Sequence, residues 1–129
     1  MRTLHPAQNA YLAAKAQYEL IAEEYRDSDR IFDAAYEGAG SPDDFQTFYD
    51  AWAAANPLEA FNAQRLCIAS NAAREVVAEA TDALLAWSLS VALTVAKTEK
   101  DRQALRDVYA TTKPTYRAKV VAMAMQLDV

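Results

Sequence analysis

The chain has 129 residues, a formal charge of −5 and 53% hydrophobic residues, with alanine at 29 positions. Its two glycines and four prolines are too few for an all-β fold, which needs turn residues at short intervals, whereas alanine favours helix. We therefore expect an all-α protein that forms a single domain over residues 1–129.

Reactive side chains are scarce, which argues against several classes of enzyme. Cys67 is the only cysteine, so the sequence offers neither an intrachain disulfide nor a cysteine-rich zinc site. His5 is the only histidine and lies close to the N-terminus, where we expect it to be solvated rather than paired with a nucleophile. We interpret Cys67 as a small buried hydrophobe. The protein is predicted not to be an enzyme.

Metal and cofactor motifs are missing from the sequence as well. It contains no Glu-x-x-His pair of the kind that helical bundles use for metals, and no glycine-rich phosphate loop. The segment 27–33, DSDRIFD, lacks the turn glycine of a calcium loop. We predict no metal site and no cofactor.

The most apolar run covers residues 83–96, ALLAWSLSVALTVA. It has 14 residues and three hydroxyl groups, which is too short for a bilayer and suits a buried helix. The N-terminal residues lack the continuous apolar core of a signal peptide. We therefore predict no membrane association and a cytoplasmic location.

The first predicted helix runs from Pro6 to Tyr36 or Glu37, with Gly38 as a left-handed residue after its last turn. Aromatic residues recur along one face at every seventh position: Tyr11, Tyr18, Tyr25 and Phe32. Burying each is worth about 1.5–3 kcal/mol, far more than a surface ion pair contributes. We interpret this line as a seam of the fold, with direct contact to a partner as the alternative.

A short second helix follows the linker GAGS. Ser41 is the predicted N-cap and Pro42 lies in the first turn. The large apolar residues of this helix fall on one face, at Phe45, Phe48, Tyr49 and Trp52. We expect this face to cap one end of the fold.

The third predicted helix starts with Asn56 as N-cap, answered by Glu59, and continues to about Lys97. Forty residues is long for one helix, so we expect any interruption near Ser70 and Asn71. Apolar residues on two sides of its second half predict that this is the most buried element.

A fourth helix is predicted from the capping signal of Thr98 and Asp101. Pro114 allows either one kinked helix or two separate ones. The apolar line keeps its phase across the proline, through Leu105, Tyr109, Thr112, Tyr116, Val120, Met123 and Leu127. The whole chain is thus predicted to be an antiparallel helical bundle of three long helices plus one short helix, with the third and fourth helices open to a kink or split.

Charge is distributed unevenly along the chain. The segment from Glu19 to Asp50 contains ten acidic and two basic residues, which gives a formal charge of −8. The segment from Lys97 to Lys119 contains seven basic and three acidic residues, which gives a formal charge of +4. The simplest interpretation is two solvated faces whose single ion pairs are worth little.

Our leading functional hypothesis is a non-enzymatic adaptor or inhibitor module that engages a basic protein surface. The candidate contact residues are Glu19, Glu23, Asp27, Asp33, Asp43 and Asp44. The alternative is a nucleic-acid-associated subunit that acts through Arg102, Arg106, Lys113 and Arg117, although the overall charge disfavours it. A bundle that binds a small molecule is third. Homo-oligomers are plausible for long helices with heptad spacing.

Overall fold

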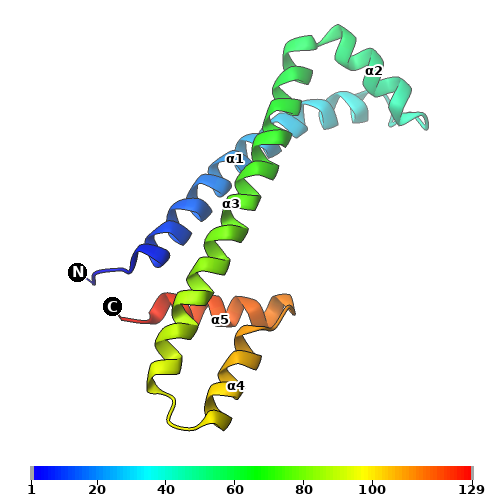
Figure 1. Ribbon diagram of the computed structural model, residues 1–129. Helices are drawn as coiled ribbons and strands as arrows, with labels where there is room; N and C mark the ends of the chain where they lie inside the picture. Colours follow the sequence, from blue (N-terminus) through cyan, green and yellow to red (C-terminus); the bar gives the residue numbers. More distant parts are fainter. Residues whose placement is uncertain (1, 129) are drawn as a thin grey trace. The chain divides into compact units, whose positions relative to one another are not determined.

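The computed structural model describes residues 2–128, and this part of the chain contains five helices and no strand (Figure 1). The all-α prediction is confirmed. Two helices are long and three are short, since the predicted fourth helix is divided in two. Their bounds are α1 Pro6–Gly38, α2 Phe45–Ala55, α3 Pro57–Val95, α4 Glu99–Tyr109 and α5 Pro114–Gln126.

The chain is divided into two compact units. We call residues 16–75 the middle unit, and residues 2–15 with 76–128 the terminal unit. The middle unit contains most of α1, all of α2 and the first half of α3. The terminal unit contains the first turns of α1, the second half of α3, and α4 and α5. Both long helices therefore run through both units.

Two capping hydrogen bonds and one stacking contact hold the start of α1 in place. The backbone N–H of His5 donates to Gln8 Oε1 (2.8 Å), and His5 Nδ1 accepts from the Ala7 backbone N–H (3.0 Å), which together cap the first turn. The His5 ring stacks on Trp87 with 4.3 Å between centroids. Our expectation of a solvated His5 is wrong, because capping and stacking half-bury it.

α1 ends in a hydrogen-bonded turn of the Schellman type. Gly40 N–H donates to the Glu37 carbonyl and Ser41 N–H to the Tyr36 carbonyl, at 2.9 and 3.0 Å. Gly40 takes the left-handed conformation with φ of 84°, followed by Ser41 with φ of 51°. The left-handed residue is therefore Gly40, and the prediction of Gly38 is wrong because α1 still includes it.

The side-chain caps predicted at Ser41 and Asn56 are not formed, although Asn56 directly precedes α3 as predicted. Asp44 caps α2, accepting from Thr47 N–H at 3.1 Å, while the predicted cap Ser41 belongs to the preceding turn. Asn56 turns its side chain back to α2, where Nδ2 donates to the Trp52 carbonyl (2.9 Å). Its backbone N–H donates to the same carbonyl and is thus not answered by Glu59. By contrast, Thr98 caps α4 as predicted, accepting from Asp101 N–H.

α3 is continuous over 39 residues, without the interruption considered near Ser70. It contains a stretch of 18 residues with mean hydropathy 1.5, long and apolar enough to cross a membrane by length and composition, and 17% of that stretch is buried. The prediction against a span considered only the 14 residues of 83–96. Core burial accounts for part of the apolarity, because Leu84 and Leu85 pack with Val120 and Ala124 of α5.

The chain breaks between α4 and α5 at residues 110–113, so Pro114 begins a new helix rather than kinking an old one. The break changes the helical phase. Val120 is buried as predicted, whereas Tyr116 and Met123 are 54% and 58% exposed. The predicted single apolar line is therefore wrong for these two residues and for Thr112, which is also exposed.

Buried polar groups join the elements of the terminal unit. The fully buried Gln8 side chain donates through Nε2 to the carbonyls of Ala124 and Leu127, both at 3.0 Å. Ser88 Oγ of α3 shares a hydrogen bond with the Tyr109 hydroxyl of α4. These bonds join the start of α1 to the end of α5, and α4 to the second half of α3.

Candidate functional site

Aromatic side chains from two helices form a cluster in the middle unit. Phe32 of α1 contacts four rings of α2, with centroid distances of 5.1 Å to Trp52, 5.4 Å to Phe45, 5.5 Å to Tyr49 and 5.8 Å to Phe48. All four contacts are tilted or edge-on, a geometry that aromatic pairs prefer. The seam interpretation holds for Phe32, which anchors α2 on α1.

A groove with a volume of about 900 Å³ opens beside this cluster. Its walls come from three helices of the middle unit. The larger side chains that line it are Tyr25, Asp29, Phe32 and Asp33 of α1, Phe45, Tyr49 and Trp52 of α2, and Phe61, Gln64 and Cys67 of α3. Phe45 is 49% exposed and Phe61 is 68% exposed. The groove thus presents large apolar surface to its surroundings.

Two carboxylates lie in the wall of the groove without a cationic partner among the described residues. Both side chains are exposed, but partial desolvation raises the pKa of Asp29, and the neighbouring charge of Asp33 raises it further. Along the same helix, Asp27 forms an ion pair with Arg30 (2.7 Å), whereas neither Asp29 nor Asp33 forms an ion pair within residues 2–128. The groove therefore combines apolar walls with uncompensated negative charge.

Tyr25 and Cys67 adjoin each other in the groove, one from α1 and one from α3. The neighbouring Cys67 thiol is the main cause that raises the pKa of Tyr25 to about 12, and burial adds to it. Cys67 is half-buried and lines the groove, so the expectation of a small buried hydrophobe holds only in part. The sole thiol of the chain thus reports on this site.

The predicted acidic contact residues separate into three groups. Asp33 lines the groove. Glu19, Glu23 and Asp27 are exposed and do not line it. Asp43 is exposed, whereas Asp44 is occupied as the N-cap of α2, where hydrogen bonds from the Thr47 hydroxyl and backbone N–H lower its pKa.

Asp29 was missed as a site residue. The sequence places it beside the aromatic seam, because it follows Tyr25 by four positions and precedes Phe32 by three. That spacing was the available signal. No sequence pattern predicts that Phe61 and Cys67 of α3 line the groove, because their position depends on where α3 packs.

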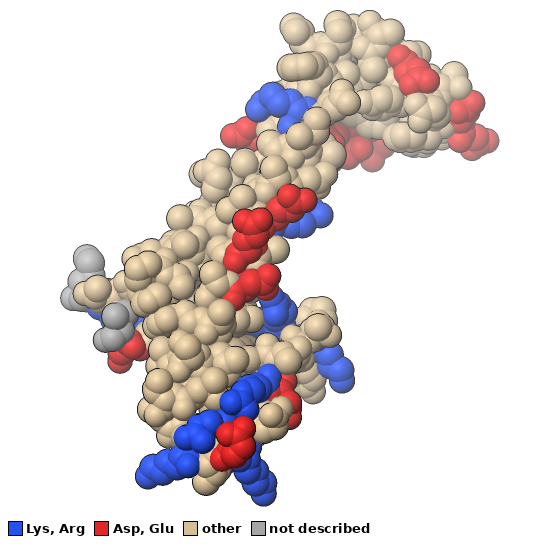
Figure 2. Space-filling model, in the orientation of Figure 1, with Lys and Arg blue, Asp and Glu red and all other residues tan. Residues whose placement is uncertain are grey.

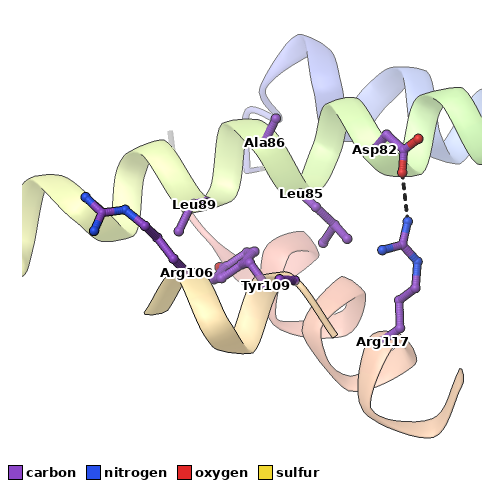
Figure 3. A pocket seen from close by; sticks show the side chains of 8 residues that line it. Asp82, Leu85, Ala86, Leu89, Arg106, Tyr109 and Arg117 are labelled. Atoms are coloured by element: carbon purple, nitrogen blue, oxygen red, sulfur yellow. Dashed lines mark hydrogen bonds and ion pairs between the residues drawn. The ribbon is translucent and has the colours of Figure 1, made fainter. Parts of the chain in front are cut away.

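The predicted basic contact residues lie on two helices and are mostly paired. Arg102 and Arg106 of α4 form ion pairs with Glu99 at 3.7 and 2.9 Å. Arg117 of α5 pairs with Asp82 of α3 at 2.8 Å (Figure 3). Lys113, before α5, lies 5.8 Å from the centre of the Tyr116 ring. The break before α5 thus separates what the sequence predicted as one line.

A smaller hollow of about 270 Å³ lies in the terminal unit, between α3, α4 and α5. Figure 3 shows Leu85, Leu89 and Tyr109 in its wall, with the Arg117–Asp82 pair at one side. Its charged side chains already have partners, because Arg106 pairs with Glu99 and Arg117 with Asp82. This hollow offers a ligand less unpaired charge than the groove of the middle unit.

The two units carry opposite formal charge. The middle unit has twelve acidic and four basic residues, a charge of −8, and the described terminal unit has six acidic and nine basic residues, a charge of +3. Figure 2 shows basic side chains gathered over α4 and the turn before it. The sequence-level asymmetry is therefore divided between two structural units.

Residues 2–128 contain no group of three or more His, Cys, Asp or Glu side chains arranged to hold a metal ion. No protein family model, no curated protein and no solved structure matches the chain. We therefore infer a function from the geometry and charge of the groove.

Proposed function

We propose that the chain is a non-enzymatic protein-interaction module, an adaptor or inhibitor, whose middle unit binds a cationic amphipathic helix of a protein partner. The observation that carries the proposal is the groove of about 900 Å³, in which exposed aromatic rings adjoin the unpaired carboxylates of Asp29 and Asp33. The sequence-based hypothesis proposed a broad acidic surface, and the present proposal restricts the binding site to the groove.

Apolar contact supplies the affinity in this proposal. Phe45 and Phe61 are largely exposed, and fully burying a side chain of this kind is worth about 1.5–3 kcal/mol. A partner helix that places apolar residues at i, i+3 or i+4, and i+7 presents a row of anchors to such a groove. The described chain has no strand that could pair with an extended peptide.

Charge supplies the selectivity. Asp29 and Asp33 repel each other, which contributes to the raised pKa of Asp29. A lysine or arginine of the partner placed between them would relieve that repulsion. A partner with acidic residues at the same positions would be rejected.

The proposal retains an antiparallel bundle, in a cytoplasmic location, as the scaffold of this site. It is supported within the middle unit by the reversal of the chain at residues 39–44, which folds α2 back so that four of its rings contact Phe32 of α1.

The test uses a fluorescent helical peptide with leucines at i, i+3, i+4 and i+7 flanked by lysines, and a twin in which glutamate replaces each lysine. Wild-type protein should bind the lysine peptide, and the glutamate twin should bind at least about tenfold more weakly, which corresponds to about 1.4 kcal/mol. Binding should also slow the reaction of Cys67 with a maleimide, because this thiol lines the groove.

The site variant Asp29→Asn/Asp33→Asn should weaken binding of the lysine peptide about tenfold, the loss expected for about 1.4 kcal/mol. The matched control Glu19→Gln/Glu23→Gln removes the same charge from residues that do not line the groove and should bind like wild type. Equal loss in both variants, or binding that leaves Cys67 fully reactive, would contradict the proposal.

The nucleic-acid hypothesis remains the competitor, with Arg102, Arg106, Lys113 and Arg117 as contacts. Electrophoretic mobility shifts at low and physiological salt separate it from the groove, since phosphate contacts weaken steeply with salt. A shift that is abolished by Lys113→Glu/Arg117→Glu and unaffected by Asp29→Asn/Asp33→Asn would favour nucleic acid.

A further inference from the structure

A second exposed apolar surface lies in the terminal unit, on α5 and the end of α4. Val108, Tyr116 and Met123 are 47%, 54% and 58% exposed. They line a shallow hollow of about 330 Å³ together with Lys119. Tyr116 and Met123 are seven positions apart on α5, so they lie on the same side of that helix.

Two lysines flank this surface. The ammonium groups of Lys113 and Lys119 lie 5.8 and 5.7 Å from the centre of the Tyr116 ring. Neither lysine forms an ion pair within residues 2–128, in contrast to Arg102, Arg106 and Arg117. We call Val108, Lys113, Tyr116, Lys119 and Met123 the α5 face. It is a cationic, amphipathic helical surface.

The α5 face has the chemistry that the groove of the middle unit requires. The groove offers aromatic walls and the unpaired carboxylates of Asp29 and Asp33, and the α5 face offers apolar side chains and two unpaired lysines. The units that carry them have charges of −8 and +3. One contact between the two surfaces would bury both exposed apolar patches and pair both sets of charges.

We propose that the partner helix is supplied by a second copy of this chain, whose α5 face binds in the groove of the first copy. The inference rests on the proposed function, since it identifies the occupant of the same groove. An anionic membrane or a nucleic acid would pair with the charges of the two lysines but would leave the aromatic groove exposed. A second copy accounts for both surfaces.

The symmetry of such a contact has a direct consequence. The two surfaces differ, so the interface is heterologous, and each copy keeps one free groove and one free α5 face after the first contact. Further copies therefore add to the assembly, which either closes into a ring or grows as an open chain. The mean mass in solution should rise with concentration and fall with added salt.

Complementation between two defective variants tests this arrangement. The groove variant Asp29→Lys/Asp33→Lys keeps its α5 face. The helix variant Tyr116→Ser/Met123→Ser keeps its groove and its two lysines but loses the exposed apolar side chains of the α5 face, so the lysines of the first variant's groove repel this altered face. Light scattering should show each variant alone as a monomer. An equimolar mixture should give a one-to-one dimer, twice the chain mass of 14.2 kDa, that does not grow further with concentration.

The control Glu19→Lys/Glu23→Lys changes the charge of the middle unit by the same amount outside the groove, and it should self-associate at least as well as wild type. Circular dichroism of every variant establishes that it is folded. A wild-type protein that stays monomeric over a hundredfold range of concentration, or a mixture that stays monomeric, would overturn the inference. If the lysine peptide still binds the wild-type groove in that case, the proposed function stands without this partner.

Discussion

The two units of this chain use the same two long helices in different ways. In the terminal unit, four side chains have 0% exposure, Gln8, Leu84, Ser88 and Ala124, and buried hydrogen bonds connect the packed elements. In the middle unit the most buried side chain is Leu66 at 3%, and the aromatic rings around Phe32 are mostly half-exposed. The terminal unit thus has a fully buried core beside its exposed α5 face, whereas the middle unit leaves aromatic surface and negative charge exposed in its groove.

This difference indicates a division of labour along α1 and α3. Close packing that excludes water gives stability, and it leaves no room for a ligand. The middle unit keeps a groove and two carboxylates that form no ion pair within residues 2–128. Three substitutions test the comparison, from the largest expected effect to the smallest.

Leu84→Ala should have the largest effect, because Leu84 is fully buried between α3 and α5. We expect the free energy of unfolding to fall by about 2–5 kcal/mol, the cost of lost burial plus the cavity left behind. Urea unfolding followed by circular dichroism measures it. The matched control Leu58→Ala, at a residue that is 80% exposed in the middle unit, should change stability by less than about 0.5 kcal/mol. Similar losses for both would contradict the burial of Leu84 in the core of the terminal unit.

Gln8→Ala tests the buried polar tie of the terminal unit. The substitution leaves the carbonyls of Ala124 and Leu127 without their donor, and we expect a loss of about 1–3 kcal/mol in unfolding free energy. Amide hydrogen exchange in α5 should also become faster. Gln103→Ala, which removes an exposed side-chain bond to Asp107, is the control and should be nearly neutral. Unchanged exchange in α5 would contradict the assigned role of Gln8.

Asp29→Asn should have the smallest effect, and of the opposite sign. Because the pKa of Asp29 is raised by folding, the folded state holds its proton more tightly than the unfolded state. The stability linked to this group is fully present below the ordinary aspartate pKa of about 3.9 and is lost as the pH rises through the raised value. Asp29→Asn should therefore be slightly more stable than wild type at neutral pH, with the gain disappearing in acid.

Unfolding midpoints from pH 3 to 8 measure the effect of Asp29→Asn. Asp27→Asn is the control, since Asp27 is exposed and paired with Arg30, and it should show no gain at neutral pH. An equal gain in stability in both variants would show that the gain comes from lowering the overall negative charge and not from the surroundings of Asp29. Loss of peptide binding together with increased stability in Asp29→Asn would mark this carboxylate as a functional residue that the fold does not need.

Local features of the chain were largely predictable. The start of α1 at Pro6, the seam through Phe32, the aromatic face of α2 and the Thr98 cap of α4 follow from side-chain periodicity and capping chemistry within a few residues. Errors arose where two local signals competed. Ser41 and Asp44 both satisfy the rules for a cap, and the turn stabilised by Gly40 decided in favour of Asp44.

The sequence by itself determined the all-α class, the aromatic seam and the separation of acidic from basic segments, because these depend on composition and on the 3.6-residue helical repeat. Tertiary structure alone decided that Phe61 and Cys67 of α3 join Asp29 in one groove, and that Gln8 fastens the last helix. Such contacts join residues far apart in the chain. Their formation depends on how whole helices pack, which no local pattern encodes.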